Sequence, residues 1–232
     1  MAELSKAIAR LMEERERAQP QVVSADVPKL RQVLEAVRAK VTIGERPLAE
    51  AFACQLFDKD GAEFLDERDV SELAALAVVA FRFVAERGQE EPRVRVFDPD
   101  MTREGWGAPC SVVESILRDR PFIVDTIQET LRHSGCIMHR LLHPVFALER
   151  DGRGMVSAVG PAGALGHKES FVHVEVERVP DPEALAALLQ QRLTEVVLAT
   201  EDYRAMRSKV EELAEELRTR PLRPPWNADL RD

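Results

Sequence analysis

The stretch from Pro109 to Arg150 decides the fold, and it reads PCSVVESILRDRPFIVDTIQETLRHSGCIMHRLLHPVFALER. Its first run, residues 111–117, is rich in branched aliphatic side chains and favours a strand. A helix follows, with Pro121 in the first turn, where a missing backbone N–H costs nothing. Gly135 stands where that helix ends. A long strand from about Ile137 to Leu148 then completes a β-α-β unit.

The helix of this unit is amphipathic, because Ile123, Ile127 and Leu131 recur every four residues and form one apolar stripe. Downstream, residues 155–159 predict a short strand that completes a hairpin. Residues 168–179 predict a further strand in which Val172, Val174 and Val176 face one way and Phe171, His173 and Glu175 face the other.

Helices are expected on both sides of these strands in the sequence. Residues 28–40, 48–57 and 67–87 show helical periodicity, and the interior of the last is apolar nearly all round. A helix of that kind is buried on several sides, so the three form a small bundle that also packs on something else. After the strands, Asp181 and Pro182 open a long helix, and residues 203–218 predict another.

These elements predict an α+β fold, with a ferredoxin-like antiparallel sheet, helices on one face of it, and a small helical bundle before it. The expected organisation has four parts. They are an N-terminal helix and linker (1–27), a helical subdomain (28–90), the α+β domain (91–202), and a C-terminal helix and tail (203–232).

Composition narrows the function. The 232 residues carry 32 Lys and Arg against 41 Asp and Glu, a net charge of −9, which argues against a nucleic-acid or anionic-membrane surface. No apolar run of about 18 residues predicts a membrane span. Cys54, Cys110 and Cys136 are scattered and odd in number, which indicates free thiols in a reducing, cytoplasmic setting.

The histidines of the strands are the first candidates for chemistry. His139 and His143 are four residues apart in an extended segment and share a face, and pairing of neighbouring strands would bring His173 near them. With Asp125 or Glu175 they could form a metal or acid–base site. The alternative is that they are hydrogen-bonded within the sheet, and no zinc-binding spacing supports a metal.

Other catalytic patterns do not stand out. Gly160, Gly163 and Gly166 recur before His167, but a strand follows them, so a hairpin loop is expected and not a phosphate cradle. No dinucleotide-binding β-α-β signature is present, so no cofactor or metal is expected in this chain. The residues alone indicate a binding or assembly module.

Three motifs make the chain similar to a known family. The segments RPFIVDTIQETL, IMHRLLHPVFALERD and SFVHVEVER resemble the N-terminal region of the large bacterial NAD-dependent glutamate dehydrogenases. Upstream, VRVFDP and Trp106 match the approach to that region. The matching motif positions are Pro121, Phe122, Val124, Asp125, His139, His143, Pro144, Arg150, His173, Glu175 and Arg178.

The resemblance implies an ACT-like module, a class that often binds amino acids and pairs between subunits. The parent family deaminates L-glutamate oxidatively to 2-oxoglutarate with NAD, but its catalytic and NAD sites lie outside these residues. The chain is therefore expected to be non-catalytic, homo-oligomeric, and in contact with the rest of a dehydrogenase chain. Residues expected to bind an effector or mark the family are Trp106, Pro121, Phe122, Asp125, His139, His143, His173 and Glu175.

Several readings stay open at this point. The chain could be an excised fragment or a free-standing relative that binds an amino acid. It could be a purely structural contact module that docks through the apolar helix at residues 72–84 and the charged helix at 203–218. A histidine-based metalloenzyme is the third reading.

Overall fold

The computed structural model describes residues 28–58, 62–86, 92–161 and 166–219. The segments predicted as an N-terminal helix and as a C-terminal tail, and Gly163, lie outside these residues. The elements are α2 (Pro28–Lys40), α3 (Arg46–Leu56), α4 (Ala62–Glu67), α5 (Val70–Ala85), β1 (Arg93–Phe97), β2 (Cys110–Arg118), α6 (Ile123–His133), β3 (Met138–Leu142), β4 (Val145–Arg150), β5 (Val156–Pro161), β6 (His167–Glu177), α7 (Pro182–Thr200) and α8 (Tyr203–Thr219).

The six strands form one antiparallel sheet in the order β1-β2-β6-β4-β5, and β3 also pairs with β6. Because β2 and the β3–β4 segment both run antiparallel to β6, they are parallel to each other on either side of it. The opening stretch is thus a β-α-β crossover with β6 inserted between its strands, and the α+β antiparallel fold is confirmed. The predicted hairpin is also confirmed, since β5 pairs with β4.

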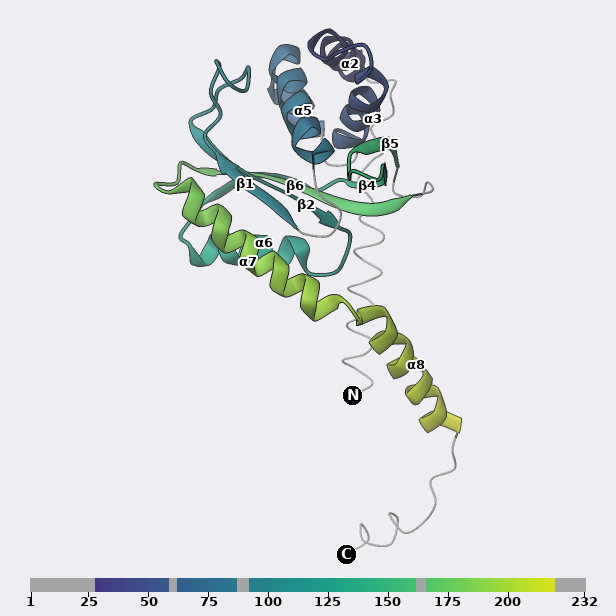
Figure 1. The fold of residues 1–232 in the computed structure, drawn as a ribbon. Coiled ribbons are helices and arrows are strands. Elements are labelled where there is room, and N and C mark those ends of the chain that lie inside the picture. The colour runs from purple at the N-terminus through teal and green to yellow at the C-terminus, as the bar shows by residue number, and fades with distance from the viewer. Residues whose placement is uncertain (1–27, 59–61, 87–91, 162–165, 220–232) are drawn as a thin grey trace, which may run out of the picture.

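Helices cover both faces of this sheet (Figure 1). On one face α6 and α7 pack over Val172, Val174 and Val176 of β6. The other face carries Phe171 and is covered by the helices α2–α5. The expected helical bundle is present, and what it packs on is the second face of the sheet.

Aromatic side chains join the bundle to the sheet. Phe52 of α3 stacks on Phe146 of β4 with ring centroids 4.8 Å apart, and its edge meets Phe171 of β6 at 6.0 Å. All three rings are fully buried. Aromatic pairs of this geometry contribute about 0.5–1.5 kcal/mol each beyond the area they bury. The helices and the sheet therefore share one core, while the domain boundary near residue 90 stays a prediction.

Three local predictions were wrong. The long strand is interrupted at His143 and Pro144, because proline has no N–H for the sheet ladder. Its carbonyl still pairs, accepting from Phe171 N at 3.0 Å. Helix α6 begins at Ile123, so Pro121 precedes the helix and Phe122 is its N-cap with φ 72°. The helix predicted at residues 67–87 begins only at Val70, and a separate short helix, α4, precedes it at Ala62–Glu67.

Candidate functional site

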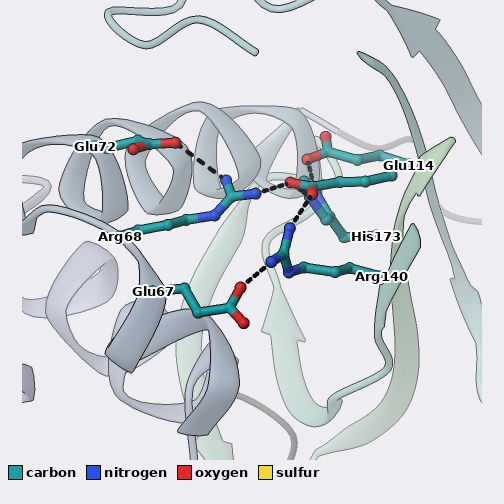
Figure 2. Close-up of polar contacts among 7 residues, drawn as sticks. Glu67, Arg68, Glu72, Glu114, Arg140 and His173 are labelled. Atoms are coloured by element: carbon teal, nitrogen blue, oxygen red, sulfur yellow. Dashed lines mark hydrogen bonds and ion pairs between the residues drawn. The ribbon is translucent and has the colours of Figure 1, made fainter. Parts of the chain in front are cut away.

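Five charged side chains lie together between the sheet and the helical bundle (Figure 2). We call Arg68, Glu114, Arg140, His173 and Glu175 the charge cluster. Strand register accounts for four of them, because Glu114 of β2 lies opposite His173 of β6, and Arg140 of β3 lies opposite Glu175 of β6. Arg68 comes from the link between α4 and α5. The cluster therefore connects three strands to the bundle.

His173 is fully buried and lies between two carboxylates. Its Nδ1 is 2.9 Å from Glu114 Oε1, and its Nε2 is 3.7 Å from Glu175 Oε1. The second oxygen of Glu114 accepts from Arg95 Nε at 2.8 Å. Glu175 accepts from Arg68. Each carboxylate is thus paired with the imidazole and with an arginine.

Arg68 lies among aromatic rings. Its guanidinium carbon is 4.8 Å from the ring centroid of Phe64 and 5.5 Å from that of Trp106, within cation–π range. It also forms an ion pair with Glu72 at 3.3 Å. Trp106 is buried in the core. Among the described residues, its contact with the charge cluster is the one with Arg68. Arginine makes cation–π contacts of this kind more often than lysine.

The buried neighbours change the acidity of the cluster. Burial raises the pKa of a carboxyl, but His173 and Arg68 outweigh it and lower the pKa of Glu175 to about 2. In the same way Arg95 and His173 outweigh burial and lower the pKa of Glu114. Burial lowers the pKa of His173, but its hydrogen bonding and charge interactions with Glu114 and Glu175 outweigh that and raise it. The paired carboxylates therefore favour the charged form of the imidazole.

With His173 protonated, the charges around the cluster balance. Arg140 pairs with Glu67 and, at 3.5 Å, with Glu175. Four cations then face four carboxylates: Arg68, Arg95, Arg140 and His173 against Glu67, Glu72, Glu114 and Glu175. An imidazolium between carboxylates is not a general base. The arrangement suits a tie between the sheet and the bundle.

The predicted site residues separate into two groups. His173 and Glu175 belong to the charge cluster, and Trp106 borders it. His139 is exposed at a register shift of β3, and His143 lies half-buried where β3 ends, so the structure does not show the expected grouping of histidines. Within the described ranges, no group of three His, Cys, Asp or Glu side chains could hold a metal ion.

Sequence reasoning named Glu175 as a possible partner of the strand histidines but missed Glu114, Arg68 and Arg140. Glu114 is the one charged side chain in the strand CSVVESIL, and a charge in such a run signals a buried ion pair. Arg140 is followed by the apolar residues Leu141 and Leu142. Arg68 lies in the polar segment DERD and carries no such signal.

The remaining predicted residues, Pro121, Phe122 and Asp125, lie at the start of α6 on the other face of the sheet. Phe122 and Asp125 border an open groove of about 1200 Å³. Arg132 of α6 and Arg192 of α7 also line it. Phe122 is 54% exposed and adopts a left-handed backbone conformation, which costs about 1–3 kcal/mol for a residue other than glycine. Such strain is a feature of ligand-binding segments.

The cysteines are free thiols. Burial raises the pKa of the Cys110 thiol to about 11, and it also raises the pKa of Cys54 and Cys136. Thiols of this kind are poor nucleophiles.

Among the described helices, none is long and apolar enough to cross a membrane. The cytoplasmic location stays a prediction.

Comparison with known proteins gives a consistent answer. Residues 52–193 match the family model described as glutamate dehydrogenase, ACT1 domain. The NAD-specific glutamate dehydrogenase of Pseudomonas aeruginosa is 29% identical over 179 residues, which cover 74% of this chain and 11% of that protein. The enzyme of the same name from Halomonas elongata is 28% identical over 199 residues, which cover 83% and 12%. The chain thus spans about an eighth or less of these relatives. No solved structure matches it.

Proposed function

The chain belongs to the glutamate dehydrogenase ACT1 domain family, and from that premise we propose that it is the N-terminal assembly and regulatory module of a large NAD-specific glutamate dehydrogenase. The observation that carries the proposal is the family match over residues 52–193 in a chain that spans only 11–12% of its named relatives. The parent enzyme would oxidise L-glutamate to 2-oxoglutarate with NAD. This chain would contribute no catalytic group to that reaction.

The charge cluster supports a non-catalytic role. Its acidic and imidazole side chains, Glu114, His173 and Glu175, are buried and paired with one another or with arginines, so they contribute to the fold and are not directed at a substrate. Family-motif residues are used in the same way. Arg150 of β4, for example, holds Glu169 of β6 through two hydrogen bonds of 2.8 Å.

The first experiment separates module from enzyme. The 232-residue chain is mixed with L-glutamate and NAD, and NADH formation is followed by absorbance; no activity is expected. The parent enzyme is then prepared with and without this segment. Loss of the segment should change the number of subunits in the assembly, as measured by sedimentation, or the effector response. NADH formation by the chain alone, or a deletion that changes neither property, would contradict the proposal.

The groove beside α6 favours an amino acid as the regulatory ligand. Asp125 of α6 lines the groove and would suit an α-ammonium group, and Arg192 of α7, which pairs with Glu195 at 2.9 Å, also lines it and would suit a carboxylate. The uncapped start of α6 adds backbone N–H groups that favour an anion. The exposed, strained Phe122 would close over the bound ligand.

Calorimetry with a panel of amino acids tests this ligand. Binding should be lost in Asp125→Asn and kept in Asp66→Asn, an exposed carboxylate outside the groove. If no amino acid of the panel binds, but assembly of the parent enzyme still depends on the segment, the chain would be a purely structural contact module. Binding to the chain with no effect in a parent enzyme would favour a free-standing amino-acid-binding protein.

A further inference from the structure

Helix α8 presents an apolar surface to solvent. Met206, Val210, Leu213 and Leu217 are between 45% and 71% exposed, and no described side chain of this helix is buried. Figure 1 shows α8 directed away from the sheet and from α6. Most of the other described residues of the helix are charged, with ion pairs such as Arg207–Glu211 and Lys209–Glu212 within it. Four large apolar side chains thus lack a covering surface in the described structure.

The spacing of these side chains indicates a partner helix. They follow one another at intervals of four, three and four residues, which is the narrow seam of a coiled coil and not the broad face of a globular helix. Most helical stability in proteins comes from packing of an apolar face, and none of the described side chains of this 17-residue helix is buried. Burial of the seam would therefore stabilise the helix itself.

The seam reads the same in both directions. When a second copy of α8 is laid antiparallel on the first, Met206 faces the partner's Leu217, and Val210 faces the partner's Leu213. All four layers are then filled by apolar side chains. A twofold interface requires this kind of self-complementarity.

The charges beside the seam favour the same arrangement. Lys209 and Glu216 flank the seam on one side of the helix. Antiparallel pairing brings Lys209 beside the partner's Glu216, and the twofold axis repeats that pair. An in-register parallel pair would instead place Lys209 beside the partner's Ala214 and form no ion pair there. Charge thus selects the antiparallel orientation.

From this spacing and charge we propose that α8 is a dimerisation helix that pairs antiparallel with α8 of a second copy of this chain. The inference concerns this chain alone and does not rest on the proposed enzyme role.

Sedimentation of the 232-residue chain tests the dimer. A concentration-dependent monomer–dimer equilibrium is expected. Val210→Glu and Leu213→Glu should each weaken it roughly tenfold or more, because the new carboxylates would be buried unpaired in the seam. Leu198→Glu, on the exposed face of α7, is the matched control and should leave the equilibrium unchanged. A chain that is monomeric at every concentration, or a dimer that survives both seam variants, would overturn the proposal.

Charge reversal tests the orientation. Lys209→Glu and Glu216→Lys should each weaken the dimer, because like charges then meet, and the double variant should restore it. Failure of the double variant to recover dimerisation would overturn the antiparallel arrangement. Neither result touches the parent-enzyme deletion described above, so the two proposals fail independently.

Discussion

Arg68 links the α4–α5 connection to the sheet through a single carboxylate, that of Glu175. The arginine side chain is 9% exposed and the glutamate 3%. We expect Arg68→Met to destabilise the fold by about 3–5 kcal/mol, because it leaves the glutamate charge buried and less well paired. Denaturant unfolding measures the change.

Arg140 provides the matched control. It pairs with the same glutamate but is 34% exposed, so Arg140→Met should cost only about 1 kcal/mol. Combining Arg68→Met with Glu175→Gln should cost less than the sum of the two single changes. Strict additivity would show that the pair is not coupled.

His173 and Glu175 give the stability of the fold a defined pH dependence. Glu175 has its pKa lowered from 4.5 to about 2, so its stabilisation is present above 4.5 and is lost as the pH falls toward 2. The pKa of His173 is raised from 6.5, so its stabilisation is complete below 6.5 and is lost as the pH rises through the raised value. The free energy of unfolding should be greatest between these limits.

Chemical denaturation at a series of pH values checks this profile, with His173→Gln as the comparison. The variant should be less stable overall and should lose the decline on the alkaline side. A wild-type stability that rises steadily from about pH 6 to about pH 9 would be the wrong sign for a buried imidazolium.

Gly135 ends α6 in a left-handed conformation, with φ 70°. Cys136 N donates to Leu131 O at 2.9 Å and Gly135 N donates to Arg132 O at 3.1 Å, the paired bonds of a glycine-terminated helix. We expect Gly135→Ala to destabilise the fold by about 1 kcal/mol. Gly44→Ala is the control, because Gly44 is outside the left-handed region and an added Cβ there meets nothing within 4 Å. Thermal unfolding of both variants compares them.

The ends of helices could be predicted from the sequence where the apolar pattern and the capping residues indicated the same position. The end of α6 at Gly135 and the start of α7, where Asp181 accepts from Ala184 N at 2.9 Å, were both predictable. Prediction failed where the backbone of a residue, and not its side-chain pattern, decides the local structure. The apolar run 137–148 hides the loss of an N–H at Pro144, and the left-handed Phe122 has no sequence signal that a glycine would give.

Across the whole molecule, the bundle and the sheet are expected to unfold together. Phe52 packs between Phe146 and Phe171, and the charge cluster crosses the same interface. A truncated chain of residues 92–219 would expose this apolar and charged face. It should bind a hydrophobic dye and lack a cooperative thermal transition. Cooperative unfolding of the truncated chain at the wild-type temperature would show instead that the sheet is independent.

The covering of both sheet faces was only partly predictable. The valines of β6 indicated one buried face. The opposite face carries Phe171, His173 and Glu175, and two of these look solvent-exposed by residue type. Their burial depends on Arg68, more than a hundred residues away, and one sequence contains no signal for such a distant pair.

The margins of the sheet have a consequence for how the chain associates. β1 carries Arg93 and Arg95, β3 has a register shift near His139, and β5 ends in Pro161, which lacks an N–H. Charges, bulges and prolines at such positions discourage an incoming strand from another chain. Polymerisation by strand addition is therefore disfavoured at these margins, so the helix–helix contact proposed for α8 would give a closed and finite assembly.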